Sequence, residues 1–229
     1  MSERINKLFT RIYKRYDIMN HLFSLGTDKL WRRKAEMIAL SDPNCCRVID
    51  IGAGTGDLSI GIALRAMKKN RKISIEAVDM NDEMMGLGMA KARVKGIESI
   101  RFAKGDALSL TYDNSFFDTM VSSFVLRNLD DFDRFAKEAH RVIKPGGRII
   151  LLDMAVPEGP SKYLFTAYFR VMRIIGKLVD KEAYDWLTSS VAAYDKRKAA
   201  SLLEKNGFAN VKTENVFPGV AFIIRGTRQ

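Results

Sequence analysis

The sequence of 229 residues predicts an α/β protein with a doubly wound, mostly parallel sheet of seven strands and an antiparallel C-terminal hairpin. The first observation behind this prediction is the alternation of short apolar runs with helical patterns between residues 47 and 153, which is typical of βαβ units. The second is the end of the chain, where a helix at Asp195–Asn206 precedes two strands joined at Pro218 and Gly219. A chain of this length suits one domain.

The individual elements follow from apolar runs, N-cap residues and glycines. Strands are expected at Arg47–Ile51, Ile73–Val78, Ile100–Ala103, Asp118–Ser122, Arg148–Asp153, Phe208–Phe217 and Val220–Thr227. Helices are expected at Asp57–Lys68, Asn81–Val94 and Asp130–Ile143, with Lys144-Pro145-Gly146-Gly147 closing the last of these. Gly207 stands at the C-cap position of the helix before the hairpin.

Two mostly helical segments lie outside the strand–helix alternation. Residues 1–40 are expected to form an N-terminal helical cap, and residues 157–194 a helical insert or lid. Both should cover the ligand end of the sheet, within one domain that spans residues 1–229.

The composition is that of a folded soluble protein, with 47% hydrophobic and 28% charged residues. No stretch approaches the roughly 20 apolar residues that span a bilayer, and the start lacks the apolar core of a signal peptide. We therefore expect a cytoplasmic protein.

The adjacent Cys45 and Cys46 have no zinc-ligand spacing, and they are interpreted as small apolar residues that lead into a buried strand. No metal site is expected.

The net charge of +11 favours a polyanion, either nucleic acid or an anionic membrane surface. One segment, residues 162–179, combines an apolar helical stripe with Arg170, Arg173 and Lys177 on the opposite face. Such a helix can lie in a membrane interface, which would place the protein peripherally at the inner face of the membrane. The alternative is a lid that packs on the core and exposes a solvated basic face.

A glycine-rich turn follows the first predicted strand, in Asp50-Ile51-Gly52-Ala53-Gly54-Thr55-Gly56-Asp57. Glycine allows a tight turn and a close approach of a ligand to the main chain. The dinucleotide fingerprint would place Gly or Ala at position 57, but Asp57 stands there. An acid at a helix N-terminus repels a pyrophosphate and can accept a hydrogen bond from an ammonium group. The turn therefore favours S-adenosylmethionine (SAM).

Two further acids follow the next strands. Asp79 ends the second strand before Met80, where a carboxylate can accept hydrogen bonds from both ribose hydroxyls. Asp106 follows the third strand, where it can accept from an adenine amine while the backbone N–H of Ala107 donates to the ring. Each acid alone is more often a solvated loop residue. Acids after successive strands, beside a glycine turn, indicate SAM-dependent methyl transfer.

The pattern of residues 45–229 resembles that of the class I SAM-dependent methyltransferases, which have a Rossmann-like fold. A narrower resemblance covers nearly the whole chain. The blocks Tyr16-Asp17-Ile18-Met19-Asn20, Leu25-Gly26-Thr27-Asp28, Trp31-Arg32-Arg33 and Ser123-Phe124-Val125-Leu126-Arg127-Asn128-Leu129 resemble the UbiE/MenG family. Three features depart from the family pattern: Val125 replaces a usual glycine, His140 replaces a common tyrosine, and Ala193-Tyr194-Asp195 stands where a Phe-Pro is frequent.

That family C-methylates a prenylated quinol in ubiquinone and menaquinone biosynthesis, so the resemblance implies the same reaction here. It implies cofactor contacts from Thr55, Asp79, Asp106, Ala107 and Ser123. The full expected cofactor set adds the other residues of the turn and its strand, and Met80. This set is Asp50, Gly52, Gly54, Thr55, Gly56, Asp79, Met80, Asp106, Ala107 and Ser123.

Methyl transfer to a quinol needs an aligned ring carbon and a stabilised phenolate oxygen. Arg127 is the candidate cation, because it follows the fourth strand at the ligand edge, and Asn128 is its hydrogen-bonding partner. Tyr16 could orient the ring, and Asp17 could be a base or a partner of Arg32. His140 is expected to be structural, and His21 lies nearer the site without a defined role. A homodimer is possible.

Other functions fit parts of the sequence. A methyltransferase could act on another small-molecule or lipid acceptor, such as a sterol or a phospholipid headgroup. The charge of +11 alone would allow an RNA methyltransferase, but the chain lacks an RNA-binding module and a base-flipping loop, so no nucleic acid is expected. A catalytically silent SAM-binding scaffold would keep the same acids and glycines.

Overall fold

The computed structural model describes residues 3–159 and 161–229, and it leaves the side chains of residues 3–5, 22, 161, 164, 171 and 173–179 undescribed. Seven strands form one sheet in the order β3-β2-β1-β4-β5-β7-β6. The strands are β1 (Arg47–Ile51), β2 (Ser74–Asp79), β3 (Ile100–Lys104), β4 (Phe117–Ser123), β5 (Ile143–Met154), β6 (Phe208–Val216) and β7 (Ala221–Arg228). The predicted fold class is confirmed.

The direction of β7 refines the prediction of an antiparallel C-terminal hairpin at the edge of the sheet. The first five strands pair in parallel, and β7 runs antiparallel to both of its neighbours, β5 and β6. The reversed strand therefore lies inside the sheet, and β6 forms the edge. The predicted closing turn at residues 144–147 was wrong in one respect, because β5 already begins at Ile143, which pairs with Phe117 across a register shift.

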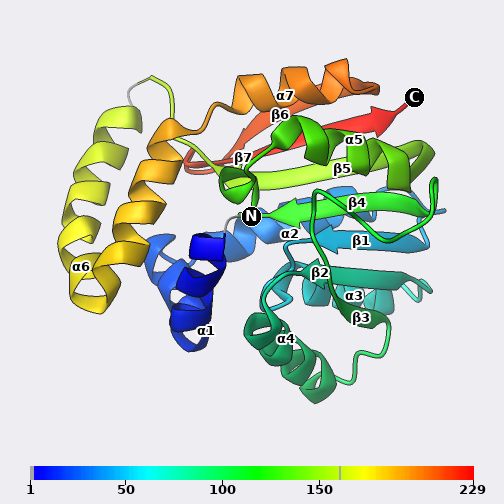
Figure 1. Cartoon of the computed structure of the whole chain (residues 1–229), viewed down its shortest axis with the longest axis horizontal. Coiled ribbons are helices and arrows are strands. Elements are labelled where there is room, and N and C mark those ends of the chain that lie inside the picture. The colour runs from blue at the N-terminus through cyan, green and yellow to red at the C-terminus, as the bar shows by residue number, and fades with distance from the viewer. Residues whose placement is uncertain (1–2, 160) are drawn as a thin grey trace.

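Helices cover both faces of the sheet (Figure 1). One face is covered by α2 (Asp28–Ala39) and α3 (Asp57–Lys68), and the other by α5 (Phe132–Val142) and α7 (Lys196–Lys205). The helix α4 (Asp82–Val94) packs on β3 at the edge, and its N-cap is the predicted Asn81, whose side chain accepts from the Met84 N–H. Each face has its own buried apolar cluster, so the sheet is central to the core.

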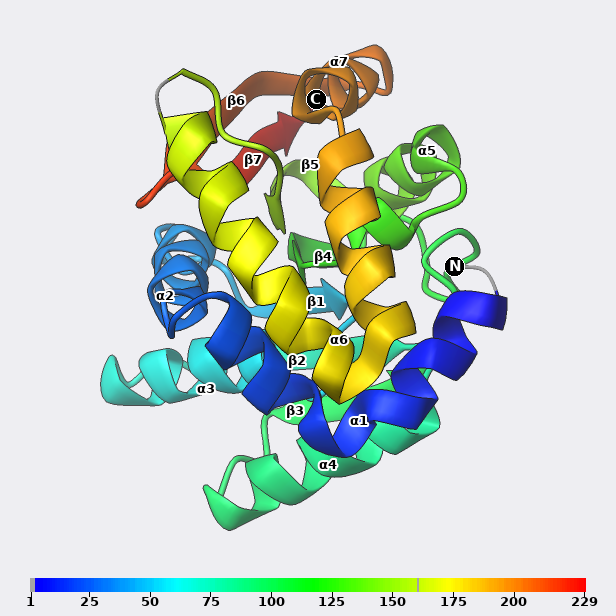
Figure 2. The same cartoon turned by 90° about the vertical axis from the view of Figure 1, so that its left-hand side faces the viewer.

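The remaining helices stand at the carboxyl ends of the parallel strands (Figures 1 and 2). They are α1 (Glu3–Phe23) and α6 (Ser161–Ala193), while a single 3-10 turn, η1 (Leu126–Asn128), follows β4. A third apolar cluster joins α1 to α6 through Phe9 and Trp186, whose ring centroids lie 5.8 Å apart, and through Phe23 and Tyr184 at 5.0 Å. This cluster fixes both helices over the ligand edge.

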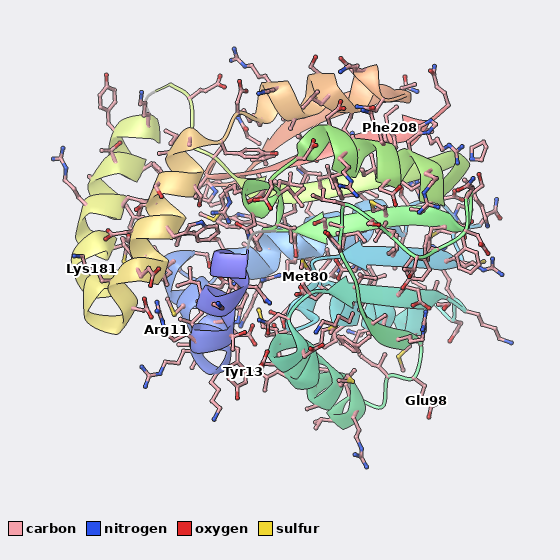
Figure 3. All side chains as sticks on the ribbon, viewed as in Figure 1. Arg11, Tyr13, Met80, Glu98, Lys181 and Phe208 are labelled. Atoms are coloured by element: carbon pink, nitrogen blue, oxygen red, sulfur yellow. The ribbon has the colours of Figure 1, made fainter. Side chains whose placement is uncertain are left out.

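The α6 segment is a hairpin of two helical arms, because the backbone leaves the helical region at Asp180, with φ −158° and ψ 105°. The Asp180 carboxylate accepts from the Ala183 N–H and therefore caps the second arm. Arg11 on α1 binds both Asp180 and Glu182, and Figure 3 shows Arg11 beside this bend.

The basic stripe predicted on the first arm of α6 lies mostly outside the described side chains. Arg173 and Lys177 are in this undescribed set, with Leu164, Val171, Ile175, Leu178 and Val179. Of the described residues, Phe165 and Met172 are buried, while Arg170 is exposed. No helix among the described residues combines the length and apolar composition that crossing a membrane requires.

Candidate active site

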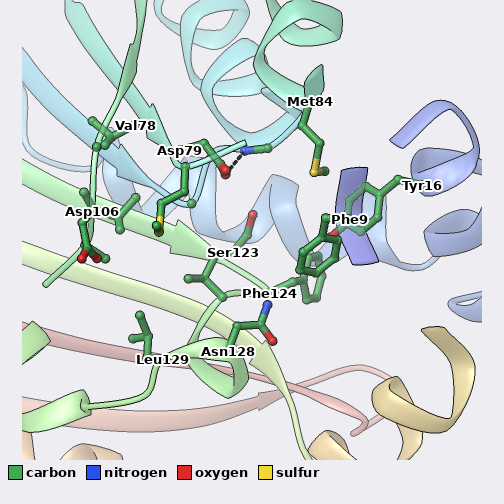
Figure 4. Close-up of a pocket in the computed structure, with 17 residues that line it drawn as sticks. Phe9, Tyr16, Val78, Asp79, Met84, Asp106, Ser123, Phe124, Asn128 and Leu129 are labelled. Carbon is green, nitrogen blue, oxygen red and sulfur yellow. Dashed lines mark hydrogen bonds between the residues drawn. The ribbon is translucent and has the colours of Figure 1, made fainter. Parts of the chain in front are cut away.

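A cavity with about 590 Å³ of open space lies at the carboxyl ends of β1, β2, β3 and β4. It sits where the strand order reverses between β1 and β4, which is where open α/β sheets bind ligands. Its lining combines strand ends with residues of α1, α4 and η1 (Figure 4). The lining residues are Phe9, Tyr16, Ile51, Gly52, Gly54, Val78, Asp79, Met80, Met84, Gly105, Asp106, Ala107, Ser123, Phe124, Val125, Asn128 and Leu129.

Most of the cofactor residues expected from the sequence lie together in this lining. They are Gly52, Gly54, Asp79, Met80, Asp106, Ala107 and Ser123. Asp50, Thr55 and Gly56 do not line the cavity. Phe9 and Met84 were not predicted from the sequence, because these side chains reach the cavity from helices whose rotation depends on tertiary packing.

Asp79 connects the glycine turn to the cavity. One carboxylate oxygen, Oδ2, accepts from the Gly54 N–H at 2.7 Å, and Oδ1 accepts from the Asn81 N–H at 2.8 Å. Burial raises the pKa of this carboxyl, and the backbone donors oppose that shift. Each carboxylate oxygen has a second lone pair, so the group can still accept from a ligand hydroxyl.

Asp106 and Asn128 supply further polar atoms to the cavity. Asp106 Oδ1 accepts from the Leu108 N–H at 3.0 Å, which fixes the loop after β3. Asn128 is only 7% exposed, and its Oδ1 has no hydrogen-bond partner among the described residues. A buried acceptor without a partner favours a ligand donor at this point. The lining therefore fits the ribose, the adenine and the polar tail of SAM.

Asp57 has a different role from the one expected. Its Oδ1 accepts from the Lys91 ammonium at 2.7 Å, and Lys91 also binds Asp17 at 2.6 Å. Thr55 donates to the same Asp17 carboxylate at 2.6 Å. Asp17 is therefore a link between α1 and the glycine turn. It lines neither of the two cavities at this edge.

Asp50 lies beneath the glycine turn and is completely buried. Its Oδ2 accepts from the Ser59 hydroxyl at 2.6 Å, while Oδ1 has no partner among the described residues. Burial raises the pKa of Asp50 to about 7, although the Ser59 hydrogen bond opposes the shift. Asp50 does not line the cavity, and through Ser59 it connects β1 to the helix that follows the turn.

The raised pKa of Asp50 predicts a pH-dependent stability. The folded protein keeps a proton that the unfolded chain releases near the ordinary aspartate pKa of 3.8. This group therefore lowers the free energy of unfolding as pH rises from about 4 to about 7. Asp50→Asn should remove that contribution, so the variant should gain stability relative to wild type between pH 5 and pH 7.5. Urea unfolding at the two pH values measures the difference.

Asp133→Asn is the control for this measurement. Hydrogen bonds from Lys137 and Asn206 lower the pKa of Asp133 to about 2, so its contribution is lost only at pH values below the tested range. The prediction for Asp50 would be wrong if Asp50→Asn and Asp133→Asn shifted stability equally at both pH values.

Gly52 is the tightest point of the turn. Its φ is +67°, and an added Cβ would lie 2.2 Å from Cγ2 of Val125. A left-handed backbone at a non-glycine residue costs about 1–3 kcal/mol, and the steric overlap adds to this cost. We expect Gly52→Ala to lower the melting temperature and to weaken SAM binding about 10-fold or more, as measured by calorimetry.

Two companion variants test the cause of this effect. Adding Val125→Gly to Gly52→Ala removes the overlap but not the backbone strain, so it should restore part of the affinity. Gly86→Ala makes the same change on α4, where an added Cβ meets nothing within 4 Å, and it should leave SAM binding unchanged. If Gly52→Ala bound SAM with wild-type affinity, Gly52 would not belong to the cofactor site.

A second cavity, with about 480 Å³ of open space, adjoins the first and shares Phe9, Tyr16 and Phe124 with it. Its lining is mainly apolar and aromatic, with a few polar groups. The lining residues are Phe9, Tyr16, Asn20, Phe23, Ser24, Asp28, Trp31, Phe124, Arg127, Met154, Trp186 and Leu187. Burial raises the pKa of the Tyr16 hydroxyl, so this group stays protonated between the two cavities.

Arg127 faces the second cavity and is buried, with 4% of its side chain exposed. Its Nε donates to Asp153 Oδ1 at 2.5 Å, and a terminal nitrogen donates to the Ser190 hydroxyl at 3.1 Å. The guanidinium carbon lies 5.8 Å from the ring centroid of Trp186. The sequence did not reveal the Asp153 partner, which neutralises much of the Arg127 charge.

Arg32 pairs with Asp28 at the start of α2, not with Asp17 as the sequence suggested. His140 packs edge-on against Phe208 at 5.7 Å, away from both cavities, in agreement with the structural role expected of it. Cys45 is buried as expected, whereas Cys46 is exposed, and both are free thiols.

Comparisons with known proteins agree with this geometry. The model of the ubiE/COQ5 methyltransferase family matches residues 1–228. The demethylmenaquinone methyltransferase of Bacteroides fragilis is 31% identical over 99% of this chain and 93% of its own length. The ubiquinone/menaquinone biosynthesis C-methyltransferase UbiE of Brucella abortus is 32% identical over 97% of this chain and 84% of its own length.

Solved structures share the fold at low sequence identity. A SAM-dependent methyltransferase from Thermotoga maritima superposes with a TM-score of 0.64 and 19% identity, covering 97% of this chain and 99% of that one. Phosphoethanolamine N-methyltransferase 2 of Haemonchus contortus, solved with SAM, superposes with a TM-score of 0.62 and 12% sequence identity. This match covers 86% of this chain and 52% of that one. With the family match over nearly the whole chain, these findings identify the chain as a SAM-dependent methyltransferase that belongs to the ubiE/COQ5 methyltransferase family.

Proposed function

We propose that this enzyme C-methylates a prenylated quinol of the demethylmenaquinol or ubiquinol-precursor type. The observation that carries the proposal is the aromatic cavity beside the cofactor cavity, with Arg127 in its wall and Tyr16 at the junction. A flat, largely apolar ring with hydroxyl substituents fits such a lining. The names of the relatives from Bacteroides fragilis and Brucella abortus support the same acceptor class.

The arrangement of the chain supports transfer between the two cavities. The carboxyl ends of the strands hold the cofactor, which when bound supplies an electrophilic methyl group. Phe9, Tyr16 and Phe124 lie between the cavities and orient the acceptor ring towards it. Arg127, held by Asp153, donates to the acceptor oxygen, and the hydrophobic cluster of α1 and α6 excludes water.

The direct experiment is an assay with SAM and a reduced demethylmenaquinone analogue, followed by mass spectrometry of the product. We expect a product heavier by one methylene unit, with the new methyl group on ring carbon. Loss of the gene should make a demethylated quinone accumulate in the organism. Transfer only to a sterol or a phospholipid headgroup would favour the alternative acceptor class.

We propose further that the protein docks on an anionic membrane to reach its acceptor. Support comes from exposed apolar residues, including Leu30 on α2, Tyr163 on α6 and Phe217 between β6 and β7. The Trp31 indole donates to the Phe217 carbonyl, so α2 and this turn are neighbours. Exposed basic residues accompany them, namely Lys29, Arg33, Lys162 and Arg170.

Charge reversal of Lys29 and Arg33 to glutamate should reduce sedimentation with phosphatidylglycerol vesicles, because each basic residue contributes about 1 kcal/mol near an anionic surface. High salt should have the same effect in the wild type. Lys68→Glu with Lys69→Glu is the matched control at the far end of α3, and it should bind like wild type. An equal loss of vesicle binding in the two double variants would contradict docking through this surface.

A homodimer is proposed on separate grounds. The outer edge of β3 is unpaired in the sheet, and a groove beside it is lined by Met89, Ile97 and Phe102 among others. Val94, on the neighbouring helix, is 89% exposed. Light scattering of wild type and Val94→Glu tests this interface, since a dimer that uses it should dissociate in the variant.

A further inference from the structure

The second cavity, in which the proposed function places the acceptor ring, is called the acceptor cavity from here on, and its described lining contains one carboxylate. Among the described residues that line it, Asp28 is the only acid, and the other ionisable groups are Tyr16 and Arg127. At neutral pH neither of these is a ready proton acceptor, because burial raises the pKa of Tyr16 and arginine stays protonated. Among the described residues that line this cavity, Asp28 is therefore the one anionic base.

Asp28 is held by three side chains. The Ser24 hydroxyl donates to Oδ1 at 2.7 Å, Arg32 donates to Oδ2, and Nδ1 of His21 lies 2.8 Å from Oδ2. Asp28 is 1% exposed as a residue, so it has no direct route to bulk water. Hydrogen bonds from Ser24 and His21 and the charge of Arg32 lower its pKa even though burial opposes them.

His21 connects this buried carboxylate to solvent. Its side chain is 34% exposed, against 2% for Asp28, and it lies near the end of α1 outside the cavity lining. An imidazole can take a proton on one ring nitrogen and release one from the other. The pair therefore forms a continuous path from the cavity wall to water.

Methylation of an aromatic carbon releases one proton per turnover, and a closed cavity must export it. We propose that Asp28 accepts the hydroxyl proton of the acceptor and passes it to Nδ1 of His21, which releases a proton to solvent from Nε2. Asp28 is the catalytic base in this scheme, and His21 is a positioning and relay residue. This proposal rests on the proposed function, because it requires an acceptor with an ionisable ring hydroxyl.

The proposed methyl transfer begins at the ring hydroxyl of the acceptor. Loss of the hydroxyl proton leaves a phenolate, whose electron pair forms the new bond between ring carbon and methyl carbon. The carbon–sulfur bond of SAM breaks with its electron pair remaining on sulfur. The hydrogen on the methylated ring carbon then moves to the oxygen as the ring regains aromaticity. The net products are the methylated quinol, S-adenosylhomocysteine and one proton.

The charges around the pair favour an ionised Asp28 between turnovers. Arg32 binds it directly, Arg127 stands across the cavity, and Asp57 lies 3.8 Å from Arg32 on the other side. Next to ionised Asp28, Nδ1 of His21 donates its hydrogen to the carboxylate; once Asp28 has taken up the acceptor proton, the relay uses the tautomer with the hydrogen on Nε2, in which Nδ1 accepts from the protonated carboxyl. The same contacts could serve only to tie α1 to α2, and the experiment must separate that structural role from catalysis.

His21→Gln is the primary variant, because glutamine can still donate to Asp28 but cannot relay a proton. We expect kcat for a soluble quinol analogue to fall about 10- to 100-fold, with KM for SAM within about 2-fold and an unchanged melting temperature. The dependence of kcat on pH should also differ from that of the wild type. His140→Gln, the matched change at the remote histidine, should leave kcat and its pH profile unchanged.

Chemical rescue provides a second readout that a structural role would not produce. His21→Ala leaves space at a partly exposed site, so added imidazole should raise its kcat several-fold without affecting wild type or His140→Gln. Wild-type kcat in His21→Gln, with the pH profile intact, would overturn the proposal. A folded wild-type enzyme that methylates no hydroxylated ring would instead overturn the proposed function, so the two failures are distinguishable.

Discussion

Replacing Asp79 with alanine should weaken SAM binding by a factor of tens or more. Both carboxylate oxygens accept from the backbone of the site, at Gly54 and Asn81, and the carboxylate lines the cavity with acceptor capacity to spare. The variant therefore loses the acceptor for the ribose hydroxyls and also releases the glycine turn. Hydrogen bonds to a charged group contribute about 1.5–3 kcal/mol each, which supports the predicted factor.

Isothermal titration calorimetry with SAM measures this effect, and Asp79→Asn separates its two causes. Asparagine keeps one acceptor oxygen, so it should retain part of the turn geometry and lose less affinity than alanine. Asp82→Ala, at an exposed carboxylate three residues away that binds Lys104, is the control and should bind SAM normally. Unchanged affinity in Asp79→Ala would exclude this residue from the site.

The parallel part of the fold could be predicted from sequence because its signals are local. Each strand contains a short apolar run, and several helices begin at a recognisable cap such as Asn81 or Asp195, whose side chains accept from the first helical turn. The glycine turn and Asp79 lie directly at strand ends, so the rule for parallel sheets places them at the ligand edge without further information.

The sequence predicted that residues 1–40 cover that edge, but it did not show which side chains of α1 face the cavities. Tyr16 and Asp17 were both candidates for a role at the acceptor, but adjacent helical residues point about 100° apart. Tyr16 faces the cavities, so Asp17 is directed to Lys91 and Thr55. The helical repeat could have indicated that only one of the two faces the acceptor.

The acceptor cavity is assembled from segments far apart in the chain. Trp31 comes from α2, Trp186 from the second arm of α6, and Met154 from the end of β5. The bend at Asp180, which brings that arm back, is stabilised by Arg11 of α1. Apolar periodicity predicts these helices as amphipathic, but it does not predict which apolar faces meet. The buried pairing of Arg127 with Asp153 was missed for the same reason.

Arg127→Met should abolish turnover and also destabilise the fold, because it leaves Asp153 without its cation. The Asp153 side chain is 0% exposed, so its charge would remain unpaired in a nonpolar environment. Removing one partner of a buried ion pair costs about 3–5 kcal/mol. Urea unfolding should show a loss of this size, and methylation of a soluble quinol analogue should fall to about 1% of wild type or less.

The double variant Arg127→Met with Asp153→Leu separates stability from catalysis. Replacing both charges with apolar groups of similar size removes the buried unpaired charge, so most of the lost stability should return. Activity should not return, because no donor faces the acceptor oxygen. Arg127→Lys keeps the charge but lacks the planar fork that spans Asp153 and Ser190, so its kcat should fall while SAM affinity stays near wild type. A stable double variant with wild-type kcat would show that Arg127 only stabilises the fold.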